Sequence, residues 1–483
     1  MPSVPSARRP PAAALCGLSL GLLLAGTAGA CFAASPSPLL SEAGRATAAA
    51  LRDGALGGTR AYDIVSSLTT EIGPRPAGSD AFQRAVEWGV RTLKDLGFQN
   101  VRTEKVTVPH WEIGEGEGRI TAPWPQPMVL AALGGSVPTP EAGIDAEVVQ
   151  AASLDALKAL DPSKVKGKIV FIAKRMERHR DGAGYRETVP GRGGGAAAAG
   201  RLGAVAFLIR SVGTDNNRTP HTGAMDYEKG GPRIPAAALS SPDADLLEKE
   251  FASGRPVTFH LKLTSRWLPD VEAGNVVGEI RGREKPDEIV LLGCHLDSWP
   301  LGTGAIDDGA GCGIVIEAAR RIGELKEKPR RTIRVVLFAN EEFGLSGGRA
   351  YAQAHAAELA HHILAGESDL GSGRVYSLAS RVAPGALPAV DEIANLLAPL
   401  GIERGDNKTA EGSDLQPLAT VPVLSLRQDA TWYFDWHHSA NDTLDKIDPK
   451  DLDQDVAAWS AAAYAAAEMT GDFGRVAPAP EQR

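Results

Sequence analysis

Histidine and carboxylate side chains follow several predicted secondary-structure elements in the second half of the 483-residue chain. His295 ends an apolar run, Asp307 stands just before a predicted helix, and Glu341 and Glu342 follow a second apolar run. Neutral imidazole and carboxylate oxygen are ligands that suit Zn²⁺, and one carboxylate can bridge two ions. The residue types and their order therefore predict a metal site.

Two further candidates come later in the chain. Asp369 follows the short apolar run 363–365, and His438 lies in a predicted loop. His437 is an equally good ligand on chemical grounds, so the residue types alone leave the choice between the two histidines open.

The chemistry of such a site follows from its charges. Two Zn²⁺ ions carry four positive charges, which three carboxylate ligands and one hydroxide balance, and such a pair activates a shared water and polarises an amide carbonyl. Glu341, beside a ligand but itself free, is the expected general base. Asp297 is expected to accept a hydrogen bond from the non-ligating nitrogen of His295. Each residue also has a structural explanation, such as helix capping by Asp307, but their joint occurrence favours the metal site.

The elements that position these residues alternate between strand and helix. Strands are predicted at 288–292, 332–338 and 421–426, and helices at 309–325, 344–359 and 452–469. Continuous apolar strands that alternate with helices predict an α/β fold, an α/β/α sandwich around a mixed, mostly parallel sheet. Ligands collect at the carboxyl ends of the strands in such sheets.

The first half of the chain differs in character. Residues 41–96 are predicted to be helical around a Gly-Pro-Arg-Pro break at 73–78, and 101–108 to form a strand. Residues 166–172 resemble a buried strand of a smaller separate lobe. The tract 193–200 contains only glycine and alanine. It lacks the Gly-Lys-Ser/Thr ending of a phosphate loop, so we expect close helix packing there.

Composition excludes some classes of partner. The chain is 43% hydrophobic, and 51 basic against 60 acidic residues give a formal net charge of -9. It contains no long basic run with interleaved aromatic residues, so we expect no nucleic-acid partner.

The N-terminus has the layout of a secretory signal. Arg8 and Arg9 precede an apolar stretch at 12–28 and small residues up to 34. This order predicts a signal peptide and an exported, periplasmic or secreted protein, with no other membrane attachment. An uncleaved anchor is the alternative, although the stretch is shorter than the roughly 20 residues of a spanning helix. Lipidation at Cys31 is a further, weaker alternative.

The chain contains four cysteines. Cys16 and Cys31 lie in or beside the predicted signal, and Cys294 and Cys312 lie in apolar segments next to the candidate ligands. We expect no disulfide framework, and we expect Cys294 and Cys312 to be buried, inert thiols.

Several motifs together resemble the carboxypeptidase Q family, also called the plasma glutamate carboxypeptidase family, of co-catalytic zinc exopeptidases. The motifs that carry the resemblance are His295-Leu296-Asp297-Ser298-Trp299, Gly304-Ala305-Ile306-Asp307-Asp308-Gly309, Glu341-Glu342, Glu367-Ser368-Asp369 and His437-His438-Ser439. The resemblance covers nearly all of the mature chain, and the middle lobe is similar to a protease-associated domain.

The resemblance implies a role for each candidate. Asp307 bridges two zinc ions per chain, His295 and Asp369 complete one ion, and Glu342 and His438 complete the other. The family has its ligand histidine directly before Ser or Thr, which favours His438 over His437. The family also implies a cis peptide bond between Asp307 and Asp308, and a homodimer.

The resemblance further implies an organisation and an activity. The implied segments are a signal peptide at 1–33, a catalytic domain at 41–122 and 269–475, an inserted protease-associated-like domain at 123–268, and a tail at 476–483. The implied activity is a zinc metallopeptidase that hydrolyses dipeptides or terminal residues of short peptides. An aminopeptidase that reads a free N-terminus and a non-catalytic, receptor-like binding protein are the alternatives.

Overall fold

The computed structural model describes residues 39–409 and 412–477. The predicted signal peptide at 1–33 and most of the predicted tail, from residue 478, lie outside the described residues. Within the described part of the chain, no helix has both the length and the apolar character needed to cross a membrane.

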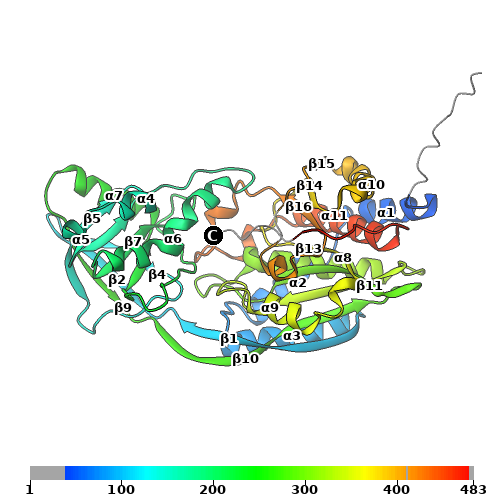
Figure 1. Cartoon of the computed structure of the whole chain (residues 1–483), viewed down its shortest axis with the longest axis horizontal. Coiled ribbons are helices and arrows are strands. Elements are labelled where there is room, and N and C mark those ends of the chain that lie inside the picture. The colour runs from blue at the N-terminus through cyan, green and yellow to red at the C-terminus, as the bar shows by residue number, and fades with distance from the viewer. Residues whose placement is uncertain (1–38, 410–411, 478–483) are drawn as a thin grey trace, which may run out of the picture. The chain divides into compact units, whose positions relative to one another are not determined.

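Eight strands form a first sheet, sheet 1. Its spatial order is β1 (Gln99–Glu112), β10 (Arg266–Ile280), β12 (Arg331–Phe338), β11 (Lys285–His295), β13 (His362–Glu367), β16 (Val423–Gln428), β14 (Val375–Arg381) and β15 (Glu403–Arg404). The central strands β12, β11, β13 and β16 run parallel. β10 pairs antiparallel with β1 and β12, and β14 pairs antiparallel with β16 and parallel with β15. Figure 1 shows β1 and β10 as a long pair of neighbouring strands.

Helices cover both faces of sheet 1. Successive residues of a strand point to opposite faces, so a strand that is apolar throughout gives both faces apolar side chains to bury. In β11, Val290 and Leu292 belong to one apolar core, whereas Ile289 and Leu291 belong to another. The first core includes residues of α1 (Glu42–Ala55), α2 (Ala61–Glu71), α3 (Asp80–Asp95), α8 (Ala310–Gly323), α10 (Leu387–Leu397) and α11 (Pro449–Glu468). The second includes residues of α9 (Ser346–Ala354) and of the 3-10 helix Ser413–Leu418. The predicted α/β class is confirmed.

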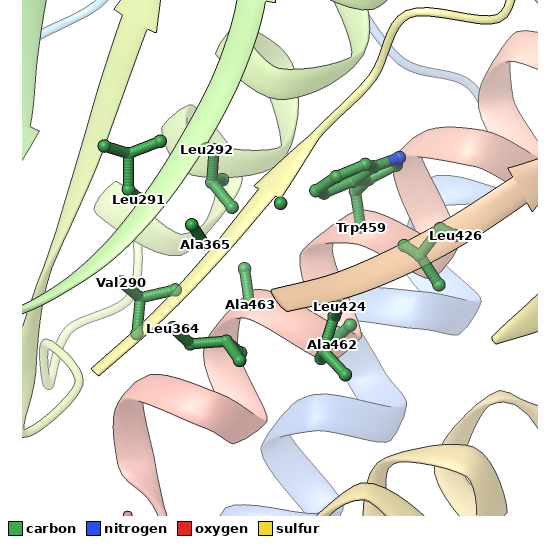
Figure 2. A pocket seen from close by; sticks show the side chains of 11 residues that line it. Val290, Leu291, Leu292, Leu364, Ala365, Leu424, Leu426, Trp459, Ala462 and Ala463 are labelled. Atoms are coloured by element: carbon green, nitrogen blue, oxygen red, sulfur yellow. The ribbon is translucent and has the colours of Figure 1, made fainter. Parts of the chain in front are cut away.

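Side chains fill the core between sheet 1 and α11 almost completely. A gap of about 20 Å³ remains beside Trp459, lined by apolar residues of β11, β13, β16 and α11 (Figure 2). A space of this size holds no more than about one water, and apolar surroundings keep it dry. We therefore interpret the gap as a packing feature of the core.

A second sheet, sheet 2, also has eight strands. Its order is β3 (Gln126–Met128), β2 (Gly116–Ala122), β9 (Thr258–Leu263), β5 (Ile144–Ala151), β6 (Ile169–Ile172), β7 (Ala206–Arg210), β8 (Ala236–Leu239) and β4 (Leu130–Ala132). Its helices are α4 (Leu154–Lys158), α5 (Pro162–Val165), α6 (Ala183–Arg201) and α7 (Ser241–Ala252). β2 lies in sheet 2 although it precedes the expected domain boundary at residue 123, and the division into domains stays a prediction.

The glycine and alanine tract lies in the second half of α6. A Cβ atom at Gly195 would clash with the ring of Phe207 on β7, so the missing side chain lets the helix approach the sheet closely. The expected use of this tract in helix packing is confirmed.

Candidate metal centre

The candidate ligands lie at the carboxyl ends of neighbouring parallel strands of sheet 1. His295 is the last residue of β11, and Glu341 and Glu342 come shortly after the end of β12. Asp369 follows the end of β13, and Asp307 lies in the turn Ala305–Gly309 that leads into α8. The order of the strands in the sheet therefore brings together residues that are far apart in the sequence.

The carboxylate of Asp307 lies between two histidines. His295 Nε2 is 3.1 Å from Asp307 Oδ1, and His438 Nε2 is 3.1 Å from Asp307 Oδ2. Each histidine also faces a second carboxylate: His295 Nε2 is 3.4 Å from Asp369 Oδ1, and His438 Nε2 is 3.2 Å from Glu342 Oε2. The two oxygens of one carboxylate thus each face a separate pair of potential ligands.

Geometry separates the two adjacent histidines. His438 contacts both Asp307 and Glu342, whereas His437 Nε2 lies 3.6 Å from Asp307 Oδ2. The His438 backbone is left-handed, with a φ of 60°, and Thr222 donates its amide to the His438 carbonyl at 2.9 Å. Such a φ is uncommon for a side chain of this size and is often found at functional sites. The arrangement favours His438 as the ligand.

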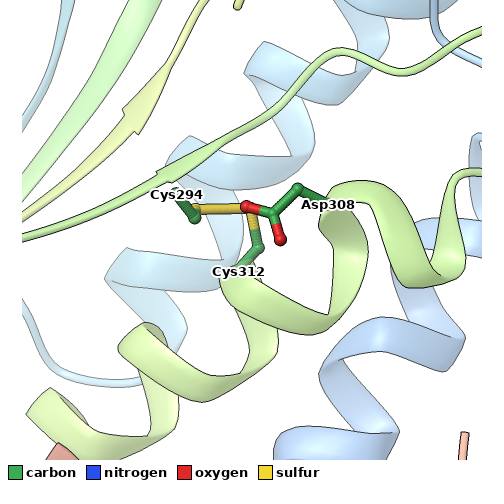
Figure 3. Close-up of side chains that lie close together, drawn as sticks. All are labelled: Cys294, Asp308 and Cys312. Atoms are coloured by element: carbon green, nitrogen blue, oxygen red, sulfur yellow. A yellow bond between two sulfur atoms is a disulfide. The ribbon is translucent and has the colours of Figure 1, made fainter. Parts of the chain in front are cut away.

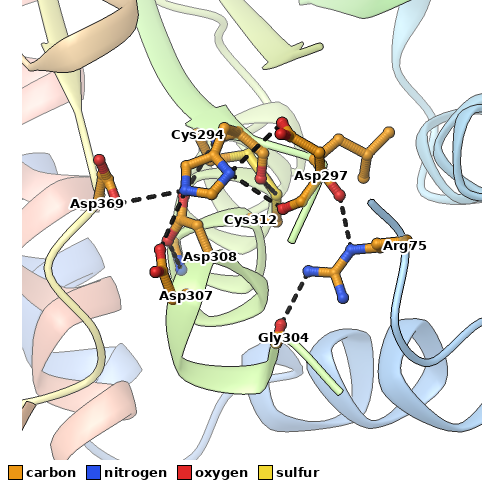
Figure 4. Close-up of a disulfide and its surroundings, with 11 residues drawn as sticks. Arg75, Cys294, Asp297, Gly304, Asp307, Asp308, Cys312 and Asp369 are labelled. Carbon is orange, nitrogen blue, oxygen red and sulfur yellow. Dashed lines mark hydrogen bonds and ion pairs between the residues drawn. A yellow bond between two sulfur atoms is a disulfide. The ribbon is translucent and has the colours of Figure 1, made fainter. Parts of the chain in front are cut away.

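Asp297 contacts the cluster through its backbone as well as its side chain. His295 Nδ1 is 3.0 Å from the backbone carbonyl of Asp297 and 3.7 Å from its carboxylate, so the carbonyl is the nearer partner (Figure 4). The carboxylate accepts the amides of Glu341, at 3.0 Å, and of Glu342, at 3.3 Å. Asp297 therefore orients the His295 ring and fixes the backbone of both glutamates.

Asp308 and Asp307 differ although they are adjacent. Asp308 Oδ1 accepts the amide of Gly311, and its Oδ2 accepts the amide of His295, so Asp308 joins the first turn of α8 to the end of β11. Asp307 has neither of these contacts and points to the histidines. The peptide bond between the two aspartates is cis, as the family resemblance implied.

A disulfide lies beside the cluster. Cys294 and Cys312 are bonded, which joins the end of β11 to the first turn of α8 (Figure 3). The expectation of two inert thiols is wrong, because the strand end and the helix start bring the two residues to a Cα–Cα separation of 5.2 Å. This separation lies within the usual range for a disulfide.

Arg75 holds the loop between His295 and Asp307. Its side chain is fully buried and donates to the carbonyls of Leu296, Thr303 and Gly304 at 2.6, 2.8 and 2.8 Å (Figure 4). Burial lowers the pKa of Arg75, although nearby aspartates, Asp442 and Asp297 first among them, act in the opposite direction. The sequence indicated only a helix break at this position.

The electrostatics of the cluster reflect close contact between opposite charges. Burial alone would raise the pKa of Asp307, but His295, His438 and His437 outweigh it and hold this pKa well below its usual value. Burial alone would lower the pKa of His295, but the carboxylates, Asp369 first among them, raise it well above its usual value. Burial raises the pKa of Glu341 well above its usual value, and Asp369 adds to this effect.

The donor set fits divalent cations. Within the described residues, Asp307 Oδ2 and Glu342 Oε1 are buried and receive no hydrogen bond. Several groups of three residues have potential ligand atoms within 4.8 Å of one another. One such group is His295, Asp307 and Glu342, and another is Asp307, His437 and His438. Buried carboxylate oxygens without donors are costly, and a bound cation removes that cost.

A cavity of about 290 Å³ opens beside the cluster. Asp307, Glu341, Glu342, Asp369 and His438 line it from the side of sheet 1. The other lining residues are Tyr185, Arg192, Ala224, Leu370, Ser413, Tyr433, Phe434 and His437. Tyr185 and Arg192 lie on α6, which packs on sheet 2.

Comparison with known proteins places this geometry in a family. The model of Peptidase family M28 matches residues 275–463, the segment that contains all five candidate ligands. Carboxypeptidase Q of Mus musculus is 36% identical over 412 residues, which are 85% of this chain and 86% of that protein. The crystal structure of a Peptidase M28 precursor from Shewanella amazonensis SB2B is 46% identical with a TM-score of 0.88, over 90% of this chain and 99% of that one.

A more distant structure shares the fold alone. The structure of a zinc aminopeptidase from Bacillus subtilis matches with a TM-score of 0.61 at 23% identity, over 85% of this chain and 95% of that one. The fold, the cluster at the strand ends and these matches define a metallopeptidase. The chain belongs to peptidase family M28, and its predicted similarity to carboxypeptidase Q is confirmed over 85% of its length.

Proposed function

We propose that the protein is an exported exopeptidase with two zinc ions per chain, which hydrolyses dipeptides or removes terminal residues of short peptides. The observation that carries this proposal is the position of Asp307, whose two carboxylate oxygens face His295 and His438 separately. His295 and Asp369 would hold one ion, Glu342 and His438 the other, and Asp307 would bridge them. The presence of all five side chains in a peptidase family argues against the non-catalytic alternative.

Bound zinc ions would polarise the amide carbonyl of the substrate and make a water molecule more acidic. Glu341 lines the cavity next to Glu342, and its amide is held by Asp297 at 3.0 Å. Its carboxylate is the base that takes the proton of the attacking water and passes it to the leaving amine. Asp297 keeps the His295 ring and the Glu341 backbone in place while this proton moves.

The test compares two adjacent glutamates. Protein stripped with a chelator and reloaded with Zn²⁺ is assayed for amino-acid release from dipeptides and for metal content by mass spectrometry. We expect Glu341→Gln to keep its metal and to lose about 100-fold to 10,000-fold in kcat. Glu342→Gln is the matched control and should lose metal as well as turnover. Full activity of Glu341→Gln would exclude its role as the base, and a reloaded wild type that binds fewer than two ions would exclude the paired centre.

Export is part of the same proposal. The Cys294–Cys312 disulfide supports it, because disulfides persist mainly in oxidising compartments. N-terminal sequencing of the protein from the periplasm or medium should find a chain that starts near residue 34. The homodimer that the resemblance implies is tested by light scattering of the same sample.

A further inference from the structure

Arg192 is a buried cation that lines the cavity beside the candidate metal centre. It lies on α6, and only 6% of its surface is exposed. Its side chain donates to Tyr185 Oη at 2.7 Å and to the carbonyls of Ala224 and Thr222 at 3.2 and 3.5 Å. In residues 39–409 and 412–477, no carboxylate forms an ion pair with it.

Other deeply buried arginines have their charge balanced by carboxylates or are surrounded by backbone carbonyls. Arg210 pairs with Asp245 at 2.7 Å, and Arg334 pairs with Glu279 at 2.8 Å. Arg75 also has no carboxylate partner among the described residues, but backbone carbonyls surround it and it does not line the cavity. A buried charge is costly unless it is paired, so Arg192 lacks an anion that the cavity can supply.

The tautomer of His438 strengthens this point. Arg192 Nη1 lies 3.3 Å from His438 Nδ1, and that nitrogen also lies 3.4 Å from the Thr222 carbonyl. A histidine that binds a cation through Nε2 carries its proton on Nδ1, which then donates to a carbonyl and cannot accept from an arginine. Arg192 Nη1 then keeps only its long contact with the Thr222 carbonyl, at 3.5 Å.

We propose that Arg192 binds the C-terminal carboxylate of the peptide substrate. The proposal rests on the proposed function and names which end of the substrate is recognised. Arg192 and Asp307 face opposite nitrogens of one imidazole ring, at 3.3 and 3.1 Å. Arg192 and the cluster line the same cavity, and the C-terminal carboxylate of a dipeptide lies only one residue, about 3.8 Å, beyond the cleaved bond. A substrate whose cleaved bond faces the cluster can therefore present that carboxylate to Arg192. The planar guanidinium is suited to bind a carboxylate through two hydrogen bonds.

The experiment varies the carboxylate and the arginine together. Three substrates are compared: Ala-Ala, its C-terminal amide, and Ala-Glu amide, which has a carboxylate only on its side chain. The proteins are zinc-loaded wild type, Arg192→Gln, Arg192→Lys and Arg201→Gln. Arg201, at the end of the same helix, is half-exposed and pairs with Glu228 at the surface, so it is the matched control.

We expect wild type to cleave Ala-Ala at least about 100-fold more efficiently than either amide, because a site built for a polar group rejects substrates without it. Arg192→Gln should reduce that ratio to a few-fold by losing activity only on Ala-Ala, with unchanged metal content. Arg192→Lys should give an intermediate ratio, and Arg201→Gln the wild-type ratio. Calorimetry on zinc-loaded Glu341→Gln should show the same preference as a difference in binding.

Several outcomes would overturn the proposal. One is equal cleavage of Ala-Ala and its amide by wild type, and another is a preference for Ala-Glu amide over Ala-Ala amide, which would indicate a side-chain carboxylate. Equal losses on all substrates together with lost metal would assign Arg192 to positioning His438. If Arg192→Gln does not fold, the proposal is tested by the preference of wild type for Ala-Ala over its amide and by the change in that preference in Arg192→Lys. If no peptide is cleaved, the proposed function fails, while the binding preference still tests Arg192.

Discussion

Two clusters of buried and partly buried histidines and carboxylates lie on sheet 1, and they differ in how their charges are balanced. The Asp307 cluster contains His295, Asp307, Glu342, Asp369 and His438. The Arg334 cluster contains Glu104, Glu279, Arg334, Tyr351, His355, Glu358 and His362. In the Arg334 cluster, Arg334 pairs with Glu279 at 2.8 Å and with Glu358 at 2.7 Å.

The difference separates a structural cluster from a functional one. Burial opposes ionisation of Glu358, but Arg334 and His355 outweigh it and lower its pKa to about 2. In the Asp307 cluster, buried oxygens of Asp307 and Glu342 receive no hydrogen bond from the described residues. Among those residues, the groups that could hold a metal ion include none from the Arg334 cluster. An internally paired cluster needs no ligand, whereas cations, as proposed above, would balance the unpaired carboxylate oxygens of the Asp307 cluster.

The largest expected effect comes from Asp307→Asn, which removes the carboxylate shared by both halves of the centre. We expect the loss of most bound zinc and a fall in kcat/KM of at least about 1,000-fold, since both ions of the proposed centre would depend on this residue. Metal content by mass spectrometry and dipeptide hydrolysis measure the two effects. Retention of two ions by the variant would contradict the bridging role of Asp307.

Arg334→Met should have the opposite effect and lower stability without changing zinc binding. It leaves two carboxylates without their cation, so we expect a loss of about 3–5 kcal/mol in the free energy of unfolding and unchanged zinc content. Denaturant unfolding measures the loss. Arg266 pairs with Glu112 on the exposed part of the same sheet, and Arg266→Met should cost less than about 1 kcal/mol. Loss of zinc in Arg334→Met would show that the two clusters are not independent.

The disulfide beside the Asp307 cluster gives a third prediction. Cys294 and Cys312 are 18 residues apart, and a disulfide that closes a loop of this length stabilises the folded protein by about 3 kcal/mol. The double variant Cys294→Ala/Cys312→Ala should lose about that much stability. A reductant should destabilise wild type to a similar extent and leave the variant unchanged. Free thiols at both positions in the purified, unfolded protein would contradict the bond.

Part of the Asp307 cluster follows from the sequence, because His295, Glu342 and Asp369 lie at or shortly after the ends of apolar strands. An α/β pattern places the ends of parallel strands at one edge, so His295 and Glu341 could be assigned to one site before their distance was known. The same reasoning could not distinguish His437 from His438. The two residues are adjacent and of the same type. What distinguishes them in the structure is the left-handed backbone of His438 and the hydrogen bond that its carbonyl accepts from the Thr222 amide.

Residues from outside these strands could not be found in this way. Arg192 and Thr222 belong to the part of the chain that builds sheet 2, and no sequence pattern connects them to the strand ends. The disulfide was missed for a similar reason, since a spacing along the chain does not give a distance in space. Arg75 was visible only as part of a Gly-Pro-Arg-Pro break. In all three cases tertiary packing, and not local pattern, sets the role.

The smallest expected effect is a pH dependence in the Arg334 cluster. His362 Nε2 lies 2.8 Å from Tyr351 Oη, and burial lowers the pKa of His362 from 6.5 to about 4. The folded protein disfavours the charged imidazole. The free energy of unfolding is therefore unaffected by His362 above pH 6.5 and decreases as the pH falls toward about 4, because the unfolded chain then binds a proton that the folded protein does not. Linkage predicts a loss of about 2 kcal/mol at pH 5 relative to pH 7.5. His362→Gln should show a shallower fall in unfolding free energy over this range, and the exposed neighbour variant His361→Gln should match wild type. Identical pH slopes for wild type and His362→Gln would show that His362 is not held neutral by the fold.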